Sequence, residues 1–245
     1  MKRIAIALVS TLALAACGGG GGDGDSNSVT PTPSNQDAAG LYGTTATGLV
    51  GSTIIFNDGS YYSIYGTPNQ TNGFITGTGT ASNGTFTSTN AKDFSAGAVL
   101  NATISASYLT KRSISGSVTY TAPARTVPFT GNYDAFYEAA PNLASLAGRF
   151  SGPAASPFAA EQISVNILAT GAFTGQGPSG CTFTGTAAPK ASGNAYDVLL
   201  NFGATACVYP SQRVSGVAVV RNNQLVVMVT TADRNGGLIF VGNKN

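Results

Sequence analysis

Few residues of this sequence could do chemistry, and histidine is not among them. The chain of 245 residues contains no His and no Trp, and only 10 Asp and Glu residues. Without an imidazole there is no Ser-His-Asp or Cys-His arrangement, no histidine general base and no histidine metal ligand. The only glutamates are Glu138 and Glu161, and we interpret both as solvated loop charges rather than as a paired-carboxylate site. The sequence therefore predicts a non-catalytic protein without a metal or a diffusible cofactor.

Two further kinds of site are disfavoured. The segment 175–180 fits the G-x-G-x-x-G pattern of dinucleotide sites, but it contains Pro178 and a predicted strand follows it, so no helix N-terminus would meet a pyrophosphate. Nucleic-acid binding is disfavoured by charge. Of the 12 Lys and Arg residues, Lys2 and Arg3 lie in the leader, which leaves ten basic residues against 10 acidic ones.

The N-terminus has the organisation of a secretory signal. A basic start, Met1-Lys2-Arg3, precedes an apolar stretch over 4–13 that is too short to span a membrane, and Leu14-Ala15-Ala16-Cys17 follows. These last four residues resemble the lipobox of bacterial lipoproteins. The resemblance implies that residues 1–16 are a cleaved signal peptide and that Cys17 carries covalent lipid, including palmitate-type acyl chains, as a membrane anchor. The alternative is an ordinary signal with an incidental cysteine.

The residues after Cys17 give the expected location. In that family an Asp after the lipidated cysteine retains the protein at the inner membrane, and this chain has Gly18, which implies the outer membrane of a Gram-negative bacterium. The stretch 18–36 reads GGGGGDGDSNSVTPTPSNQ and lacks apolar periodicity. We therefore expect 17–39 to be the lipidated cysteine and a flexible tether, with the folded part facing the periplasm or the cell surface.

The remaining cysteines predict a disulfide. With Cys17 used by lipid, Cys181 and Cys207 are an even pair in an oxidising compartment. Cys181 opens one predicted strand and Cys207 follows the end of the next, with 190–193 as the turn between them. Antiparallel pairing of these strands brings the two cysteines together, and the absence of a Cys-x-x-Cys spacing argues against a redox-active pair.

Beyond the tether the pattern is typical of an all-β protein. Short runs rich in Thr, Val, Ile, Tyr and Phe alternate with turn residues, and Asp58-Gly59, Asn83-Gly84 and Asn222-Asn223 are hairpin signals. Only the segment 141–147 reads as helical. We predict two tandem small antiparallel meander β-barrels of seven or eight strands each, because closure removes exposed strand edges.

Four collinear matches indicate a duplication. The matching pairs are 40–43 with 148–151, 84–89 with 181–186, 114–118 with 214–218, and 129–132 with 240–243. They place module 1 at 40–135, a connector at 136–147 and module 2 at 148–245, with most contacts inside each module and the two outer matched segments as neighbouring strands that close each barrel. A transmembrane barrel is the alternative, but the predicted strands are too short to cross a bilayer.

Tyrosine carries the remaining functional signal. Tyr61, Tyr62, Tyr65 and Tyr108 lie in module 1, and their rings are either core residues or, where they face outward, a candidate contact patch for a protein or glycan. The chain combines a lipobox, a Gly-rich tether and small predicted barrels. In this combination it loosely resembles the transferrin-binding-protein-like surface lipoproteins, whose barrel lobes bind host proteins. Two functions follow: a binding or structural envelope lipoprotein, or a carrier of a small apolar ligand inside a barrel, for which an empty apolar cavity would be diagnostic.

Overall fold

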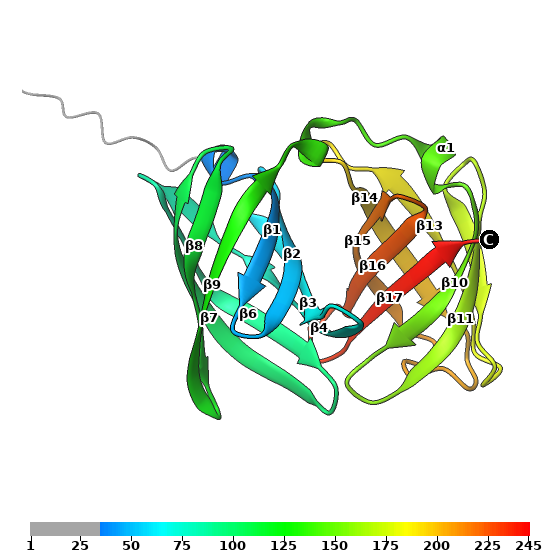
Figure 1. Cartoon of the computed structure of the whole chain (residues 1–245). Coiled ribbons are helices and arrows are strands. Elements are labelled where there is room, and N and C mark those ends of the chain that lie inside the picture. Colours follow the sequence, from blue (N-terminus) through cyan, green and yellow to red (C-terminus); the bar gives the residue numbers. More distant parts are fainter. Residues whose placement is uncertain (1–34) are drawn as a thin grey trace, which may run out of the picture. The chain divides into compact units, whose positions relative to one another are not determined.

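The computed structural model describes residues 35–245, which form two closed eight-stranded antiparallel β-barrels in tandem (Figure 1). The predicted all-β fold with two tandem barrels is confirmed. The signal peptide, the lipidation site Cys17 and most of the tether lie outside the described residues. Within 35–245 there is no helix long and apolar enough to cross a membrane.

Barrel 1 contains nine strands that occupy eight positions. The strands are β1 (Gly40–Ala46), β2 (Leu49–Ile55), β3 (Ser60–Thr67), β4 (Gln70–Thr78), β5 (Thr80–Ser82), β6 (Thr85–Ser95), β7 (Ala98–Leu109), β8 (Ser113–Thr121) and β9 (Ala124–Asp134). β4 and β5 both pair with β6, and β1 pairs with β9, so β4 and β5 share one position and the sheet closes. The two segments are separated at Gly79, where a Cβ would lie 2.3 Å from Cζ of Phe86.

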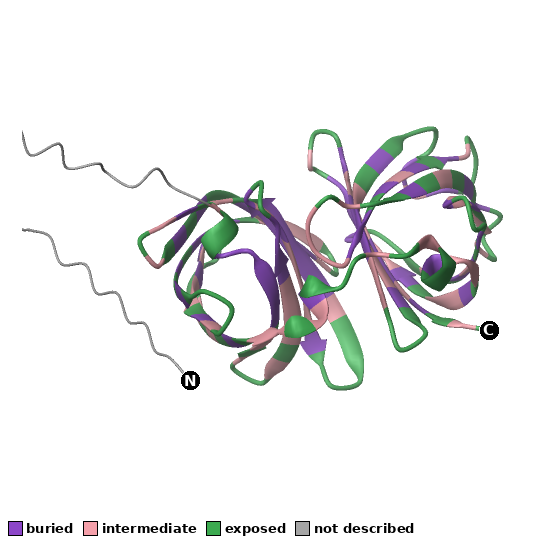
Figure 2. Ribbon diagram, turned by 90° about the horizontal axis from the view of Figure 1, so that it is seen from above, coloured by how far each residue is buried: buried purple, intermediate pink, exposed green. Residues whose placement is uncertain are grey.

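Barrel 2 is a regular meander. Its strands are β10 (Gly148–Ala155), β11 (Ala160–Ile167), β12 (Ala172–Gln176), β13 (Thr182–Pro189), β14 (Tyr196–Phe202), β15 (Arg213–Arg221), β16 (Gln224–Thr231) and β17 (Gly237–Lys244). Each strand pairs with the next one along the chain, and β10 pairs with β17 to close the barrel. The strands of both barrels alternate buried and exposed residues, as the stripes in Figure 2 show, because successive side chains point to opposite faces of a strand.

The hairpins form at the predicted turn residues. Asn83 and Gly84 between β5 and β6, and Asn222 and Asn223 between β15 and β16, all have positive φ. Two consecutive residues with positive φ are the signature of a type I′ turn, which matches the twist of antiparallel strands. Gly59 at the β2–β3 turn also has a positive φ, of 82°.

The closing strands of the two barrels are equivalent residue by residue. In barrel 1, Ala46 of β1 is paired with Phe129 of β9. In barrel 2, Ala154 of β10 is paired with Phe240 of β17. These pairs are related by the offsets of 108 and 111 found in the sequence, so the outer two matched segments are neighbouring strands in each barrel, as predicted.

The inner two matches do not join equivalent strands. The match of 84–89 with 181–186 joins β6, the fifth strand position of barrel 1, to β13, the fourth strand of barrel 2. The match of 114–118 with 214–218 joins β8, the seventh position, to β15, the sixth strand. The sequence alignment of the modules is therefore wrong by one strand in the middle, because Gly/Thr-rich strands resemble one another at any position of a meander.

The segment predicted as a connector contributes to the core of barrel 2. It contains a 3₁₀ turn, η2 (Ala135–Glu138), and one helical turn, α1 (Leu143–Leu146). The side chain of Leu146 is fully buried in the core of barrel 2. Tyr196 fixes this segment, since its hydroxyl donates to the Asn142 carbonyl at 2.7 Å and accepts from the Asn142 amide at 2.9 Å. The connector therefore covers one end of barrel 2 with the side chain of Leu146.

The barrels also share an apolar cluster, in addition to the contacts within each module. Phe74 and Phe94 of barrel 1 stack with ring centroids 4.9 Å apart. They belong to one buried cluster with Met228 and Ile239 of barrel 2. A Cβ at Gly237 would lie 2.6 Å from Cδ1 of Phe94, so glycine is needed there for the close approach.

Candidate ligand cavity in barrel 1

The interiors of the two barrels differ in how completely side chains fill them. In barrel 2 the remaining space is about 40 Å³. Four phenylalanines and the covering Leu146 line this remaining space; the phenylalanines are Phe173, Phe183, Phe202 and Phe240. A space of this size is close to that of a single water molecule, so barrel 2 has no room for a ligand.

Barrel 1 contains a cavity of about 450 Å³ that is open at one end of the barrel. Its apolar wall comes from residues that alternate inward along the strands, including Ile75, Ile104, Ile114 and Val118. The residue that corresponds to Leu146 at the same offset of 108 is Ala38, which is fully buried but adds only a methyl group. The volume lies within the range of about 300–1,000 Å³ found for small-molecule sites.

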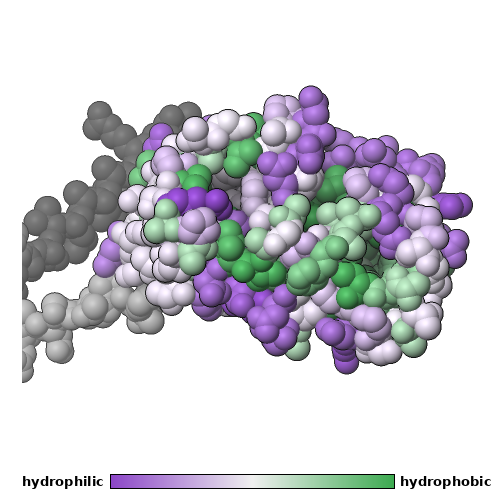
Figure 3. All heavy atoms as spheres, turned by 90° about the horizontal axis from the view of Figure 1, so that it is seen from below, coloured by the Kyte–Doolittle hydropathy of each residue, from purple (hydrophilic) through white to green (hydrophobic). Residues whose placement is uncertain are grey.

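The cavity reaches the surface at one end of the barrel. Residues 44–50 around the β1–β2 hairpin and 125–129 at the start of β9 line this end, and Val50 is 44% exposed there. Figure 3 views both barrels from this side, and apolar residues gather in the middle of the face of the whole molecule, with polar residues around them. An apolar molecule could therefore enter between the hairpins.

A buried carboxylate forms the polar part of the wall. Asp93 of β6 is 1% exposed, and each of its oxygens accepts a hydrogen bond from a phenol. Tyr65 Oη donates to Oδ1 at 2.6 Å, and Tyr120 Oη donates to Oδ2 at 2.7 Å. Burial raises the pKa of the Asp93 carboxyl above its usual value, although the two phenol donors and the charge of Arg125 act to lower it. Burial and the neighbouring carboxylate likewise raise the phenol pKa values of Tyr65 and Tyr120.

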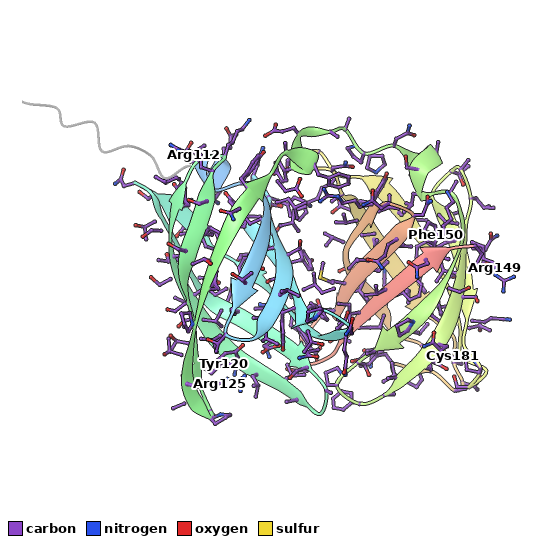
Figure 4. The ribbon with its side chains drawn as sticks, viewed as in Figure 1. Arg112, Tyr120, Arg125, Arg149, Phe150 and Cys181 are labelled. Atoms are coloured by element: carbon purple, nitrogen blue, oxygen red, sulfur yellow. A yellow bond between two sulfur atoms is a disulfide. The ribbon has the colours of Figure 1, made fainter. Side chains whose placement is uncertain are left out.

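Arg125 lies at the open end beside this group. Its guanidinium carbon is 4.2 Å from the centroid of the Tyr120 ring, and the residue is exposed to solvent. Tyr120 and Arg125 are directly paired across β8 and β9, and Figure 4 shows both at the lower end of barrel 1. The cavity therefore has apolar walls, one buried negative side chain and one exposed positive side chain.

The predicted tyrosine patch does not lie on the outer surface. Tyr61 is 1% exposed, its hydroxyl lies 3.0 Å from Ser88 Oγ, and burial raises its pKa to about 12. Tyr108 is buried in the same core, Tyr65 lines the cavity, and Tyr62 packs against the cluster shared with barrel 2. Of the two alternatives, the outward contact patch is not found: Tyr61 and Tyr108 are core residues, and Tyr62 and Tyr65 pack against buried clusters.

Sequence reasoning missed Asp93, Tyr120 and Arg125. In β6, Phe86 and Ser88 point inward, and an alternation of two would place Asp93 on the outer face. The register of β6 against β7 shifts between Ser88 and Ala91, which turns Asp93 to the inside. No residue type in the sequence signals this bulge.

The other predicted features have structural roles. Cys181 and Cys207 form a disulfide with Cα atoms 4.6 Å apart, as predicted. Glu138 pairs with Lys111 at 2.9 Å, and Glu161 accepts a hydrogen bond from the Ser179 amide at 3.3 Å. The glycine-rich stretch 175–180 ends β12 and turns into β13 without a helix. In residues 35–245 no cluster of three or more Cys, Asp or Glu side chains could hold a metal ion.

Comparison with known proteins gives no relative. The sequence matches no protein-family model, and no curated protein or solved structure matches the chain.

Proposed function

We propose that the protein is a non-catalytic, lipid-anchored carrier that binds a small, largely apolar molecule inside barrel 1. The observation that carries this proposal is the difference between the two interiors, about 450 Å³ in barrel 1 against about 40 Å³ in barrel 2. Two barrels with the same closing register differ in the one property that a carrier needs. An interior cavity favours a carrier over a binder that works through its outer surface.

The lipobox and tether supply the setting of this proposal. Cys17 would anchor the chain at the outer membrane, and the glycine-rich segment would let barrel 1 reach molecules near the membrane surface. Barrel 2, whose interior is filled and which contains the disulfide, would serve as a support. Capture of a protein or glycan by the outer surface, the first function expected from the sequence, becomes the second reading, because the candidate contact residues Tyr61 and Tyr108 are buried.

A fluorescent probe tests the proposal directly. The neutral amphiphile N-phenyl-1-naphthylamine should bind the mature protein at one site with a rise in emission, because the cavity wall is mostly apolar. Val118→Trp places a large ring into the cavity and should weaken probe binding by at least about tenfold. No emission rise with the natural protein would overturn the proposal.

Thr119→Trp is the matched control. Thr119 follows Val118 on β8 but points out of the barrel, where its hydroxyl lies 3.3 Å from that of Thr126. The natural chain has no Trp, so each variant contains a single indole that reports its own environment. The indole emission should be blue-shifted in the Val118 variant and at the wavelength of a solvent-exposed Trp in the Thr119 variant. The Thr119 variant should bind the probe with the affinity of the natural protein. Equal probe affinity in the two variants would place the probe outside barrel 1.

A further inference from the structure

Asp93 is the single acidic side chain in the lining of the barrel 1 cavity, within the part of the chain that the structure describes. Its pairing partners on the neighbouring strands are Ile75 of β4 and Leu100 of β7, and both are apolar. The carboxylate is therefore removed from water, and its partners on both neighbouring strands are apolar. Such a group is costly to bury unless it is paired.

No cation of the described residues pairs with this carboxylate. Over 35–245, no Lys or Arg nitrogen lies within 4.0 Å of the Asp93 oxygens. The adjacent Lys92 points out of the barrel and binds Asn235 Oδ1 at 3.2 Å. Arg125 is placed over the Tyr120 ring rather than on the carboxylate. Two phenol donors are thus the direct partners of a buried carboxyl group that borders an open cavity.

We infer that barrel 1 binds amphiphiles with an apolar body and one ammonium group, and that Asp93 pairs with the ammonium. This inference rests on the carrier function proposed above and specifies its ligand class. A carboxylate has about four lone-pair sites and the two phenols use two of them, which leaves acceptors for ligand N–H groups.

The volume and the apolar wall of the cavity indicate the size and polarity of the remaining part of the ligand. A volume of about 450 Å³ equals about fifteen water molecules at roughly 30 Å³ each, which suits a body of similar atom count. The apolar wall formed by Ile104, Ile114 and Val118 takes the hydrocarbon part. A ligand carboxylate would meet repulsion from Asp93, so an anion is disfavoured even though Arg125 stands at the mouth.

Three ligands of equal chain length test the inference. Decylammonium, decanol and decanoate should displace the neutral probe from the full mature protein at pH 7, each used below its micelle concentration. A hydrogen-bonded charge pair predicts that decylammonium binds about ten to a hundred times more tightly than decanol. Decanoate should bind most weakly.

Two substitutions assign the effect to its residues. Asp93→Asn keeps the shape but removes the charge, so decylammonium should fall to the affinity of decanol while the probe still binds. Arg125→Gln removes a like charge at the mouth, and decylammonium should then bind several times more tightly with decanol unchanged. Because Arg125 is exposed, this variant keeps the test decisive even where the Asp93 variant does not fold.

The outcomes separate the inference from the proposed function. Probe binding without any advantage of decylammonium over decanol would overturn the ligand class and leave the carrier function standing. Tight decanoate binding that is lost in Arg125→Gln would assign the cavity to anionic amphiphiles and also overturn it. Failure of the probe and of all three ligands to bind would overturn both.

Discussion

The same substitution should change stability in opposite directions in the two barrels. Val118 of β8 and Val198 of β14 are both buried, point into their barrels and line the interior space. Changing either residue to Phe adds four carbon atoms to the interior. Val118→Phe places them in a cavity of about 450 Å³, whereas Val198→Phe places them in a space of about 40 Å³.

The size of each effect follows from the available volume. Burial of a phenylalanine in place of a valine should raise the free energy of unfolding by about 1 kcal/mol where space already exists. Forcing the same atoms into a filled core costs about 1–3 kcal/mol, because neighbouring side chains must leave their preferred rotamers. The two variants should therefore differ by about 2–4 kcal/mol, which corresponds to a difference in melting temperature on the order of 10 °C for a chain of this size.

Thermal and urea unfolding of the two variants, followed by far-ultraviolet circular dichroism, measure the difference. Val118→Phe should melt at or above the temperature of the natural protein, and Val198→Phe should melt below it. Equal destabilisation by both substitutions would refute the reasoning, because it would mean that the barrel 1 interior is as tightly filled as that of barrel 2.

Three further predictions concern the disulfide, Asp93 and Cys17. Replacing both Cys181 and Cys207 by Ala should lower the free energy of unfolding by about 3 kcal/mol, since the bridge joins residues 26 apart; an unchanged urea midpoint would contradict this. Because the folded-state pKa of Asp93 is raised, its favourable contribution is complete below the usual value of 3.8 and is lost as the pH rises through the raised value. Asp93→Asn has no carboxyl group to ionise, so its free energy of unfolding should rise relative to that of the natural protein as the pH rises through the raised pKa of Asp93. Curves of stability against pH that run parallel for the two proteins would refute the raised pKa. Cys17→Ser should abolish lipid labelling and leave the protein unprocessed or soluble, and a variant that is still labelled and still sediments with membranes would exclude Cys17 as the acyl acceptor.

Local sequence signals predicted the architecture well because they act over a few residues. Asn83-Gly84 and Asn222-Asn223 adopt the positive φ that tight hairpins require, and their residue types mark these turns in the sequence. The pairing of Cys181 with Cys207 followed from one hairpin with a known turn. Closure of each barrel followed from the order of the strands and the cost of exposed edges.

The candidate site depended on features that no local pattern contains. The inward position of Asp93 arises from the bulge between Ser88 and Ala91, and a bulge reverses the face of every later residue in its strand. The full burial of Leu146 arises because the connector covers the end of barrel 2, which depends on where a distant tyrosine, Tyr196, holds it.

The sequence by itself determined that the chain is all-β, that it is divided into two modules and that the second module contains one disulfide, because turn residues, alternation and cysteine spacing are read within a hairpin. Only the tertiary structure decided that barrel 1 is hollow and barrel 2 is filled. A cavity is the volume left when side chains from eight strand positions meet, so it depends on the sum of distant residues and on the register between strands. The same packing placed Tyr65 and Tyr120 on Asp93 and gave barrel 1 its one buried charge.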